Sequence, residues 1–375
     1  MTKVVSGVRR RQRQMSDDWK EQKKRQKAIF TAQQNLPYDV KVRRAELRAR
    51  EFIQELDRRG MNVHVSVGGL DSIVLLMFLR SRGIDVPAVS VSSLEDKSII
   101  KVHRQLGVIS LRPGKPKTEI LQEFGFPVIS KKIAGRIDTL QNPTDRNKTV
   151  RHAIITGECG AQGHFAKNSR MKLPRKWLQL FAGYENENES VNYQIAPFKV
   201  SNKCCLYMKE KPCEVYAKEN NSAPFLGLMA SEGGQREEAL VEHGCNYFGK
   251  SVIRSAPFAP FLRQDLLQLA LDLNVPVPEI YGEIARKADG TLYTTKAQRT
   301  GCSMCGFGVH LEKRPHRFDM LRERNEKEWE FWMYRCCVDP KTGERFGWGR
   351  VLDYIGVRWE DKWEPEPEQL EIHFC

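Results

Sequence analysis

Residues Asn62 to Leu79 read NVHVSVGGLDSIVLLMFL, and this stretch predicts a strand, a tight turn and a helix in succession. Every second residue from Val63 to Val67 is a valine, as in a β-strand. Gly68 and Gly69 allow a sharp turn with positive φ and close approach of another group to the backbone. The apolar helix that follows begins at Asp71, a residue type that favours helix starts. Free N–H groups and the helix dipole make such a turn an anion site, and the expected anion is phosphate or sulfate.

Strand and helix patterns continue on both sides of this stretch. We expect a helix at 45–59, a strand at 88–91, a helix at 98–106, a strand at 108–111, a strand at 223–229 and a helix at 264–273. This spacing predicts an α/β fold, with a parallel sheet flanked by helices. Ligands bind beyond the carboxyl ends of parallel strands, which places the Gly68–Ser72 turn and the Ser92–Ser93 loop on one edge.

Composition limits the class of protein. The chain has 375 residues, 40% of them apolar, which is enough for a sizeable core. No apolar run approaches the ~18 residues that cross a bilayer, and the basic N-terminus lacks the apolar stretch of a secretory signal. We therefore expect a cytoplasmic protein without a membrane partner. In that compartment the 10 cysteines are expected to include metal ligands rather than a disulfide framework.

Positive charge is concentrated at the N-terminus. The net charge is +14, and residues 1–50 hold 15 Lys and Arg against 5 Asp and Glu. A solvated basic arm explains this pattern. A nucleic-acid contact explains it equally well, because basic segments gain affinity from phosphates by counterion release. We expect three segments: a basic arm at 1–44, an α/β domain at 45–290 and a small cysteine-bearing module at 291–375.

A second glycine-rich segment fits a phosphate-loop pattern in letters only. Gly244–Ser251 reads GCNYFGKS, which matches the Walker A string. A true P-loop follows a strand and opens a helix, whereas here a helical segment at 236–243 precedes the motif and two prolines follow it. We therefore expect no phosphate site at this segment.

The turn at Gly68 resembles the pyrophosphate-binding loop of adenine nucleotide alpha hydrolases, SGGxDS. Within that superfamily the chain resembles the phosphoadenosine phosphosulfate reductase family, in particular phage and bacterial members with long C-terminal extensions. Agreement runs from about Ala45 to Val357. The matching motifs are GFPVISKK (Gly125–Lys132), LQNPT (Leu140–Thr144), KLPRKW (Lys172–Trp177), SNKCCLYMKEKP (Ser201–Pro212), HGCN (His243–Asn246), RTGCSMCGFGVHLEKRPHRF (Arg299–Phe318) and VLDYIGV (Val351–Val357).

The resemblance implies an adenine nucleotide, either ATP or 3'-phosphoadenylyl sulfate, with Mg²⁺ as a further candidate cofactor. The residues it assigns to nucleotide binding are Ser66, Gly68, Gly69, Leu70, Asp71, Ser72, Ser92, Ser93, Lys132, Lys172 and Lys176. Those it assigns to catalysis are Asp71, Ser72, Arg236 and Lys131. One position departs from the family, because Val67 stands where a serine hydroxyl is expected. The loss of one hydrogen bond to a charged group weakens binding by roughly 1.5–3 kcal/mol.

The cysteine spacing carries a second signal. Cys204 and Cys205 are adjacent, and Cys302 and Cys305 form a C-x-x-C between glycines. This arrangement looks like the iron–sulfur layout of adenylylsulfate reductases, and thiolates in this number suit a [4Fe–4S] cluster or a tetrahedral zinc. The expected ligands are Cys205, Cys245, Cys302 and Cys305, with Cys204 in reserve. The adjacent Cys336 and Cys337 are expected to pack beside Trp329 and Trp332.

The leading function is that of a phosphoadenosine phosphosulfate reductase-like oxidoreductase in sulfur metabolism, with a thiol or sulfur donor protein as partner. Family reductases use a cysteine in an E-C-G-[LI]-H motif, which this chain lacks; EIHFC at Glu371–Cys375 is a poor substitute. The alternative is ATP-dependent sulfur transfer to a nucleic acid, as in related phosphorothioation and thiolation enzymes. A third reading is a non-catalytic nucleic-acid-binding accessory.

Overall fold

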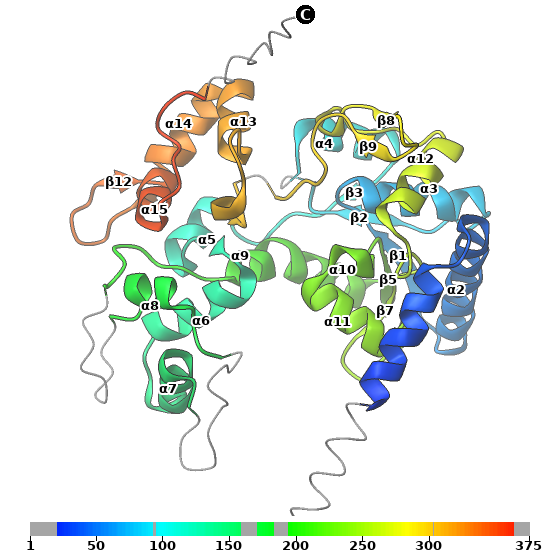
Figure 1. Ribbon diagram of the computed structural model, residues 1–375, viewed down its shortest axis with the longest axis horizontal. Coiled ribbons are helices and arrows are strands. Elements are labelled where there is room, and N and C mark those ends of the chain that lie inside the picture. The colour runs from blue at the N-terminus through cyan, green and yellow to red at the C-terminus, as the bar shows by residue number, and fades with distance from the viewer. Residues whose placement is uncertain (1–20, 93–94, 159–170, 184–193, 303, 364–375) are drawn as a thin grey trace, which may run out of the picture. The chain divides into compact units, whose positions relative to one another are not determined.

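The computed structural model describes residues 21–92, 95–158, 171–183, 194–302 and 304–363. The chain divides into two compact units, each built from two separate segments (Figure 1). Met1–Arg112 and Pro212–Ser303 belong to the first unit, and Pro113–Lys211 and Met304–Cys375 belong to the second. Among the described residues, no helix combines the length and the apolar character that crossing a membrane requires.

The first unit contains a six-stranded sheet in the order β3-β2-β1-β5-β7-β6. All neighbouring pairs are parallel except β6 with β7. The strands are β1 (Asn62–Ser66), β2 (Ala88–Ser90), β3 (Ile109–Ser110), β5 (Ser222–Leu226), β6 (Asn246–Phe248) and β7 (Ile253–Ser255). The mostly parallel sheet confirms the predicted α/β class.

Strand order creates a ligand-binding position beside β1. The chain runs from β1 outward through β2 to β3, and β5 then returns to the other side of β1. Val65 pairs with Ala88 on one side and with Phe225 on the other. Sheets of this kind bind ligands where the strand order reverses. In this protein that position is the carboxyl end of β1, where the glycine turn lies.

Helices and short elements surround this sheet (Figure 1). Its helices are α2 (Tyr38–Arg58), α3 (Leu70–Ser81), α4 (Lys97–Gln105), α10 (Lys211–Glu219), α11 (Gly234–His243) and α12 (Arg263–Asp272), and residues 21–34 are also helical. The short elements are the 3-10 turns η4 (Ala230–Glu232) and η5 (Glu279–Tyr281) and the hairpin of β8 (Ile284–Arg286) and β9 (Leu292–Thr294). Phe52, Phe78 and Phe225 are fully buried in the core, which lies between the sheet and its helices.

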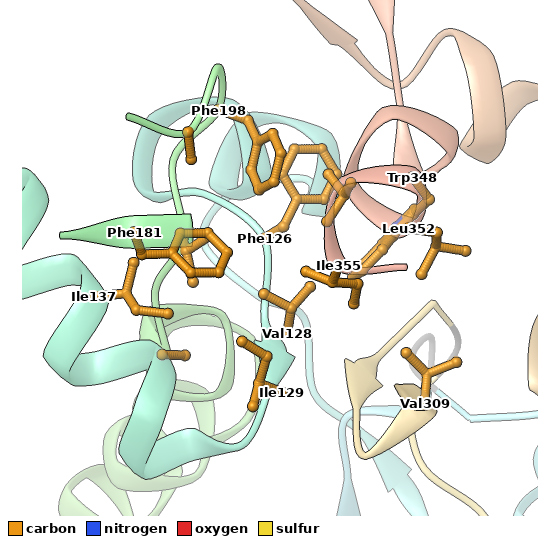
Figure 2. Close-up of a cluster of buried hydrophobic side chains, with 14 of the residues drawn as sticks. Phe126, Val128, Ile129, Ile137, Phe181, Phe198, Val309, Trp348, Leu352 and Ile355 are labelled. Atoms are coloured by element: carbon orange, nitrogen blue, oxygen red, sulfur yellow. The ribbon is translucent and has the colours of Figure 1, made fainter. Parts of the chain in front are cut away.

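The second unit is mainly helical and has its own core. Its helices are α5 (Lys117–Phe124), α6 (Lys131–Gln141), α7 (Lys148–Thr156), α8 (Arg175–Phe181), α9 (Lys203–Cys205), α13 (Arg317–Arg324), α14 (Glu326–Tyr334) and α15 (Trp348–Ile355). Its short elements are η2 (Asp145–Asn147), the π-helix η3 (Leu206–Glu210), η6 (Val309–Leu311), β4 (Val128–Ile129), β10 (Gly306–Phe307), β11 (Cys337–Val338) and β12 (Arg345–Phe346). The rings of Phe126 and Trp348 meet edge to face at 5.0 Å in this core (Figure 2).

Contacts between distant segments change two details of the predicted organisation. Helix α2 begins at Tyr38, seven residues before the expected start, so it crosses the predicted arm boundary at residue 44. Lys41, counted with the basic arm, is buried and pairs with Asp265 at 2.5 Å. The two compact units also cut across the three predicted segments, because residues 113–211 pack with the C-terminal segment rather than with the sheet.

Candidate functional site

The glycine turn between β1 and α3 is closed by Ser72. The Gly68 N–H donates to Ser72 Oγ at 2.7 Å, and that hydroxyl donates to the Gly69 carbonyl at 2.9 Å. Neither glycine has a positive φ, so this part of the prediction is wrong. Ser66 ends β1 and is half-buried. Val67 is 6% exposed and belongs to the core cluster, so the residue that replaces the expected serine contributes apolar packing.

A tyrosine hydroxyl covers the start of α3. The Leu70 N–H donates to Tyr281 Oη at 3.0 Å, and Tyr281 Oη lies 2.6 Å from Thr300 Oγ1. A Cβ on Gly69 would lie 2.3 Å from the same phenol oxygen. Any larger residue would clash with Tyr281, so this position requires glycine. Burial raises the pKa of Tyr281, which keeps the phenol neutral. An oxygen acceptor therefore occupies the position where a helix N-terminus binds phosphate oxygens.

A buried histidine joins this turn to the loop after β2. His103 Nε2 lies 2.8 Å from the Gly68 carbonyl, and His103 Nδ1 lies 3.3 Å from Ser92 Oγ. Burial lowers the pKa of His103, so the ring is neutral. Since the carbonyl can only accept, Nε2–H donates to it and Nδ1 accepts from Ser92. Ser92 thus supports the turn through His103, and Ser93 lies outside the described residues.

Asp71 is paired at the first turn of α3. Arg263 from α12 donates to Asp71 Oδ1 at 2.5 Å and to the Gln298 carbonyl at 3.1 Å. Burial raises the pKa of Asp71, the charge of Glu232 acts in the same direction, and Arg263 and Arg299 oppose them. Asp71 is therefore held beside two guanidinium groups and a second carboxylate.

Arg236 lies in the first turn of α11, which covers the helical segment expected at 236–243. It forms an ion pair with Glu232 at 2.5 Å, and Arg299 approaches the same carboxylate at 4.0 Å. On the other side of the turn, Glu95 Oε1 would lie 3.5 Å from a Cβ on Gly68. Carboxylates and guanidinium groups thus alternate around the turn. An anion at the turn would therefore meet repulsion from the carboxylates and hydrogen-bond donors from the guanidinium groups.

The end of strand β5 packs against the start of α3. A Cβ on Gly227, the residue after β5, would lie 2.8 Å from the backbone nitrogen of Ser72. The contact places the carboxyl end of β5 beside the turn, and the parallel pairing of β1 with both β2 and β5 brings the carboxyl ends of all three strands to one edge. His103, Tyr281 and Arg263 were missed in the sequence interpretation. Only the position of His103, in the helix after the Ser92 loop, gave any signal, because the partners of Tyr281 and Arg263 are distant in the chain.

The predicted basic residues of the second unit are exposed and do not share a unit with the turn. They are Lys131, Lys132, Lys172 and Lys176. Lys131 lies 3.5 Å from Glu210, and the Lys176 ammonium lies 4.9 Å from the centre of the Trp177 ring. Their assignment to nucleotide binding or catalysis stays a prediction.

The predicted metal ligands are also divided between the units. Cys245 and Cys302 belong to the first unit, whereas Cys204, Cys205 and Cys305 belong to the second. Burial raises the pKa of Cys245. Within the described residues, no group of three or more His, Cys, Asp or Glu side chains is placed to hold a metal ion. The cluster therefore stays a prediction, and we assign it no step.

The Walker-like segment Gly244–Ser251 forms part of an edge hairpin. Strand β6 lies inside the motif, and β7 follows it in antiparallel pairing. A Cβ on Gly249 would lie 2.6 Å from the Tyr247 ring, so this glycine accommodates a side chain of the hairpin. A strand and a hairpin thus stand where a P-loop would lead into a helix, and the expectation that this segment holds no phosphate stays a prediction.

The family resemblance rests on motifs alone. A comparison with models of known protein families finds no match to this chain, and a search of curated proteins finds none either.

Proposed function

We propose that the glycine turn binds the phosphates of an adenine nucleotide and that the protein is a phosphoadenosine phosphosulfate reductase-like enzyme. The observation that supports this best is the hydrogen bond from the Leu70 N–H to the oxygen of Tyr281. It marks an acceptor position at the N-terminus of α3, at the edge where parallel sheets bind ligands. A phosphate oxygen that replaces the phenol would receive the same hydrogen bond.

Side chains around the turn have distinct roles in this proposal. Arg263 and Arg299 supply forked donors for phosphate or sulfate oxygens. Asp71, at the first turn of α3, has carboxylate oxygens of the kind that Mg²⁺ prefers, and the ion itself would be carried by the nucleotide phosphates. His103 holds the Gly68 carbonyl and so orients the turn. A bound nucleotide supplies the activated phosphoanhydride or sulfate group, and the arginines stabilise negative charge that develops on it.

The carboxylates also favour a second candidate function, ATP-dependent sulfur transfer to a nucleic acid. Magnesium normally accompanies ATP, and carboxylates beside a phosphate site suit a metal-bound triphosphate better than a free sulfonucleotide. The missing E-C-G-[LI]-H motif points the same way, because it removes the expected sulfur nucleophile. The reductase-like and transfer readings share the nucleotide site and differ in what attacks the bound nucleotide.

Titration calorimetry tests the shared site. ATP with Mg²⁺, ATP with a chelator and phosphoadenosine phosphosulfate should be compared on the full chain. Asp71→Ala should weaken binding of magnesium ATP, whereas Lys250→Ala in the β6–β7 hairpin serves as the matched control and should not. Binding that disappears only in Lys250→Ala would contradict the choice of phosphate loop.

Turnover assays separate the functions. A reductase consumes sulfonucleotide with a thiol donor alone, a transfer enzyme consumes ATP only with nucleic acid and a sulfur donor, and an accessory binds nucleic acid without turnover. The basic arm should be shortened by residues 2–20 only, because a longer deletion approaches α2 and the buried Lys41. The logarithm of the DNA-binding constant falls linearly with the logarithm of the salt concentration. Each phosphate contact that is removed should make this slope shallower by about 0.9 for duplex DNA. If the full chain bound no nucleic acid at low salt, both nucleic-acid functions would be rejected and only the reductase-like function would remain.

A further inference from the structure

A shallow, open cavity of about 490 Å³ in the second unit is lined by two adjacent cysteines, Cys336 and Cys337, among other residues. Its walls come from α5, the end of α14, β11 and β12, and include Gln122, Phe331 and Arg345. No residue of the proposed nucleotide site or of the predicted metal centre lines this cavity. The inference below is therefore independent of the proposed function.

The two sulfur atoms converge because the backbone changes conformation between them. Helix α14 ends at Tyr334, its C-cap Arg335 has φ −134° and ψ −3°, and β11 starts at Cys337. In a regular strand, neighbouring side chains point to opposite faces. At this helix-to-strand junction, the Cys336 thiol instead donates to Cys337 Sγ at 4.0 Å. Both residues are thiols, and they are 6% and 3% exposed.

Surrounding contacts hold this pair in place. The Gln122 side chain accepts from the Val338 N–H and donates to the Val338 carbonyl, both at 2.8 Å, which ties α5 to β11. Cys337 pairs with Phe346 in the β11–β12 ladder. Both cysteines belong to the buried cluster that contains Trp329, which confirms the expected packing. They therefore combine apolar support with access to a cavity.

The chemistry of the cavity suits a soft ion. Two thiols at this separation can bind one atom as a chelate, since the first bond makes the second intramolecular. Soft thiolate ligands select soft, thiophilic ions over hard cations. The hydrogen bond to Cys337 and burial raise the pKa of Cys336, so the pair enters the reaction as thiols and releases both protons on binding.

We propose that Cys336 and Cys337 form a dithiol site for a soft, thiophilic metal or metalloid ion. With a monosubstituted trivalent arsenical as the probe, the two S–H bonds break and two As–S bonds form. The arsenic-bound oxygen leaves as water with both protons, and no electron is transferred. The product is a cyclic dithioarsenite that one thiol cannot displace easily and that a competing dithiol can.

Phenylarsine oxide tests the proposal on the reduced full chain. After incubation with one equivalent, the protein should be unfolded, alkylated with N-ethylmaleimide and mapped by mass spectrometry. Cys336 and Cys337 should be protected together, and dimercaptopropanol should remove that protection. Cys336→Ser should expose Cys337 to alkylation, whereas Cys204→Ser, in the other adjacent pair, should leave the protection unchanged.

Two outcomes would overturn the proposal: alkylation of both cysteines despite the arsenical, or protection of Cys337 that survives in Cys336→Ser. Because either cysteine variant can also disturb the core, Thr118→Trp provides a test that keeps both thiols. Thr118 lines the cavity from α5, so the larger side chain should slow adduct formation. An unchanged rate in a folded Thr118→Trp protein would show that the ion does not enter through this cavity.

Discussion

Tyr281 Oη accepts a hydrogen bond from the Leu70 backbone nitrogen at 3.0 Å, across 211 positions of sequence. The contact satisfies a donor that the first turn of a helix otherwise leaves open. If the turn binds a nucleotide as we propose, the nucleotide must displace the phenol before this N–H can contact a phosphate. The phenol would then both stabilise the unliganded protein and compete with the ligand.

Tyr281→Phe should tighten binding of magnesium ATP by about tenfold, since a hydrogen bond to a charged phosphate is worth roughly 1.5–3 kcal/mol and the competing phenol is removed. The same variant should lower the unfolding free energy of the unliganded protein by about 1 kcal/mol, because the Leu70 N–H loses its acceptor. Calorimetric titration and urea unfolding measure the two effects. Weaker nucleotide binding in the variant would show that the phenol contacts the ligand directly.

Gly69→Ala should destabilise the protein by about 1–3 kcal/mol through overpacking. The Gly69 backbone has φ −76°, which alanine adopts freely, so the cost comes from the 2.3 Å approach of Tyr281 Oη to the new Cβ. Adding Tyr281→Phe should recover part of the loss, because it removes the clashing atom. Gly114→Ala is the control, since no atom lies within 4 Å of its Cβ position. Equal unfolding free energies for Gly69→Ala with and without Tyr281→Phe would refute the assigned contact.

Lys41→Met should cost about 3–5 kcal/mol, the usual penalty for leaving one partner of a buried ion pair alone. Lys41 and Asp265 are 3% and 8% exposed, and the Lys41 ammonium also donates to the Gln34 carbonyl at 3.1 Å. Arg43→Met should change stability by less than about 1 kcal/mol, because the Arg43–Asp39 pair is exposed. Urea unfolding of both variants measures the difference. A loss in Lys41→Met no larger than in Arg43→Met would contradict the buried pair.

Stability should fall in acid partly through His64, which is 1% exposed and lies 2.8 Å from Ser222 Oγ. Burial lowers its pKa from 6.5 to about 4. The unfolded chain therefore binds the proton first, so this contribution is complete above pH 6.5 and declines as the pH falls towards 4. Its full size is about 3 kcal/mol. His64→Gln should make the unfolding free energy less dependent on pH across this window, which urea unfolding at several pH values measures.

Protein purified without oxygen should be brown and should contain iron with acid-labile sulfide, if Cys205, Cys245, Cys302 and Cys305 hold a [4Fe–4S] cluster. Serine at Cys302 or Cys305 should remove the colour, whereas serine at Cys213 should not. Colourless protein with stoichiometric zinc would reject the cluster and keep the ligand set. Stable, metal-free protein would reject both.

Local patterns were sufficient to predict the central strands. The alternating valines of β1 and the turn before α3 are properties of adjacent residues, so the sequence interpretation located them correctly. Arg263, Tyr281 and Lys41 acquire their roles from partners far away in the chain. Charge counting therefore assigned Lys41 to a solvated arm, although it is buried against α12.

The glycine turn shows the same limit at the level of individual atoms. Gly68 and Gly69 predicted positive φ and close approach, but neither has a positive φ and only Gly69 is closely approached. The assignment of Ser72 to ligand binding stays a prediction, and the sequence did not indicate that its hydroxyl also closes the turn. The type of a residue indicates which interactions it can make. Its neighbours in the folded chain determine which of those interactions it makes.

The alternation of the two units along the chain has a consequence for synthesis on the ribosome. Strands β1, β2 and β3 emerge first, but β5, which must pair with β1, follows only after the whole of Pro113–Lys211 has been translated. At roughly 5–20 residues per second, translation of this segment takes about 5–20 s, and β1 has no neighbouring strand on its β5 side during that time. An unpaired edge of this kind recruits other strands. Nascent chains should therefore depend on chaperones during this interval, and slow translation should prolong the exposure.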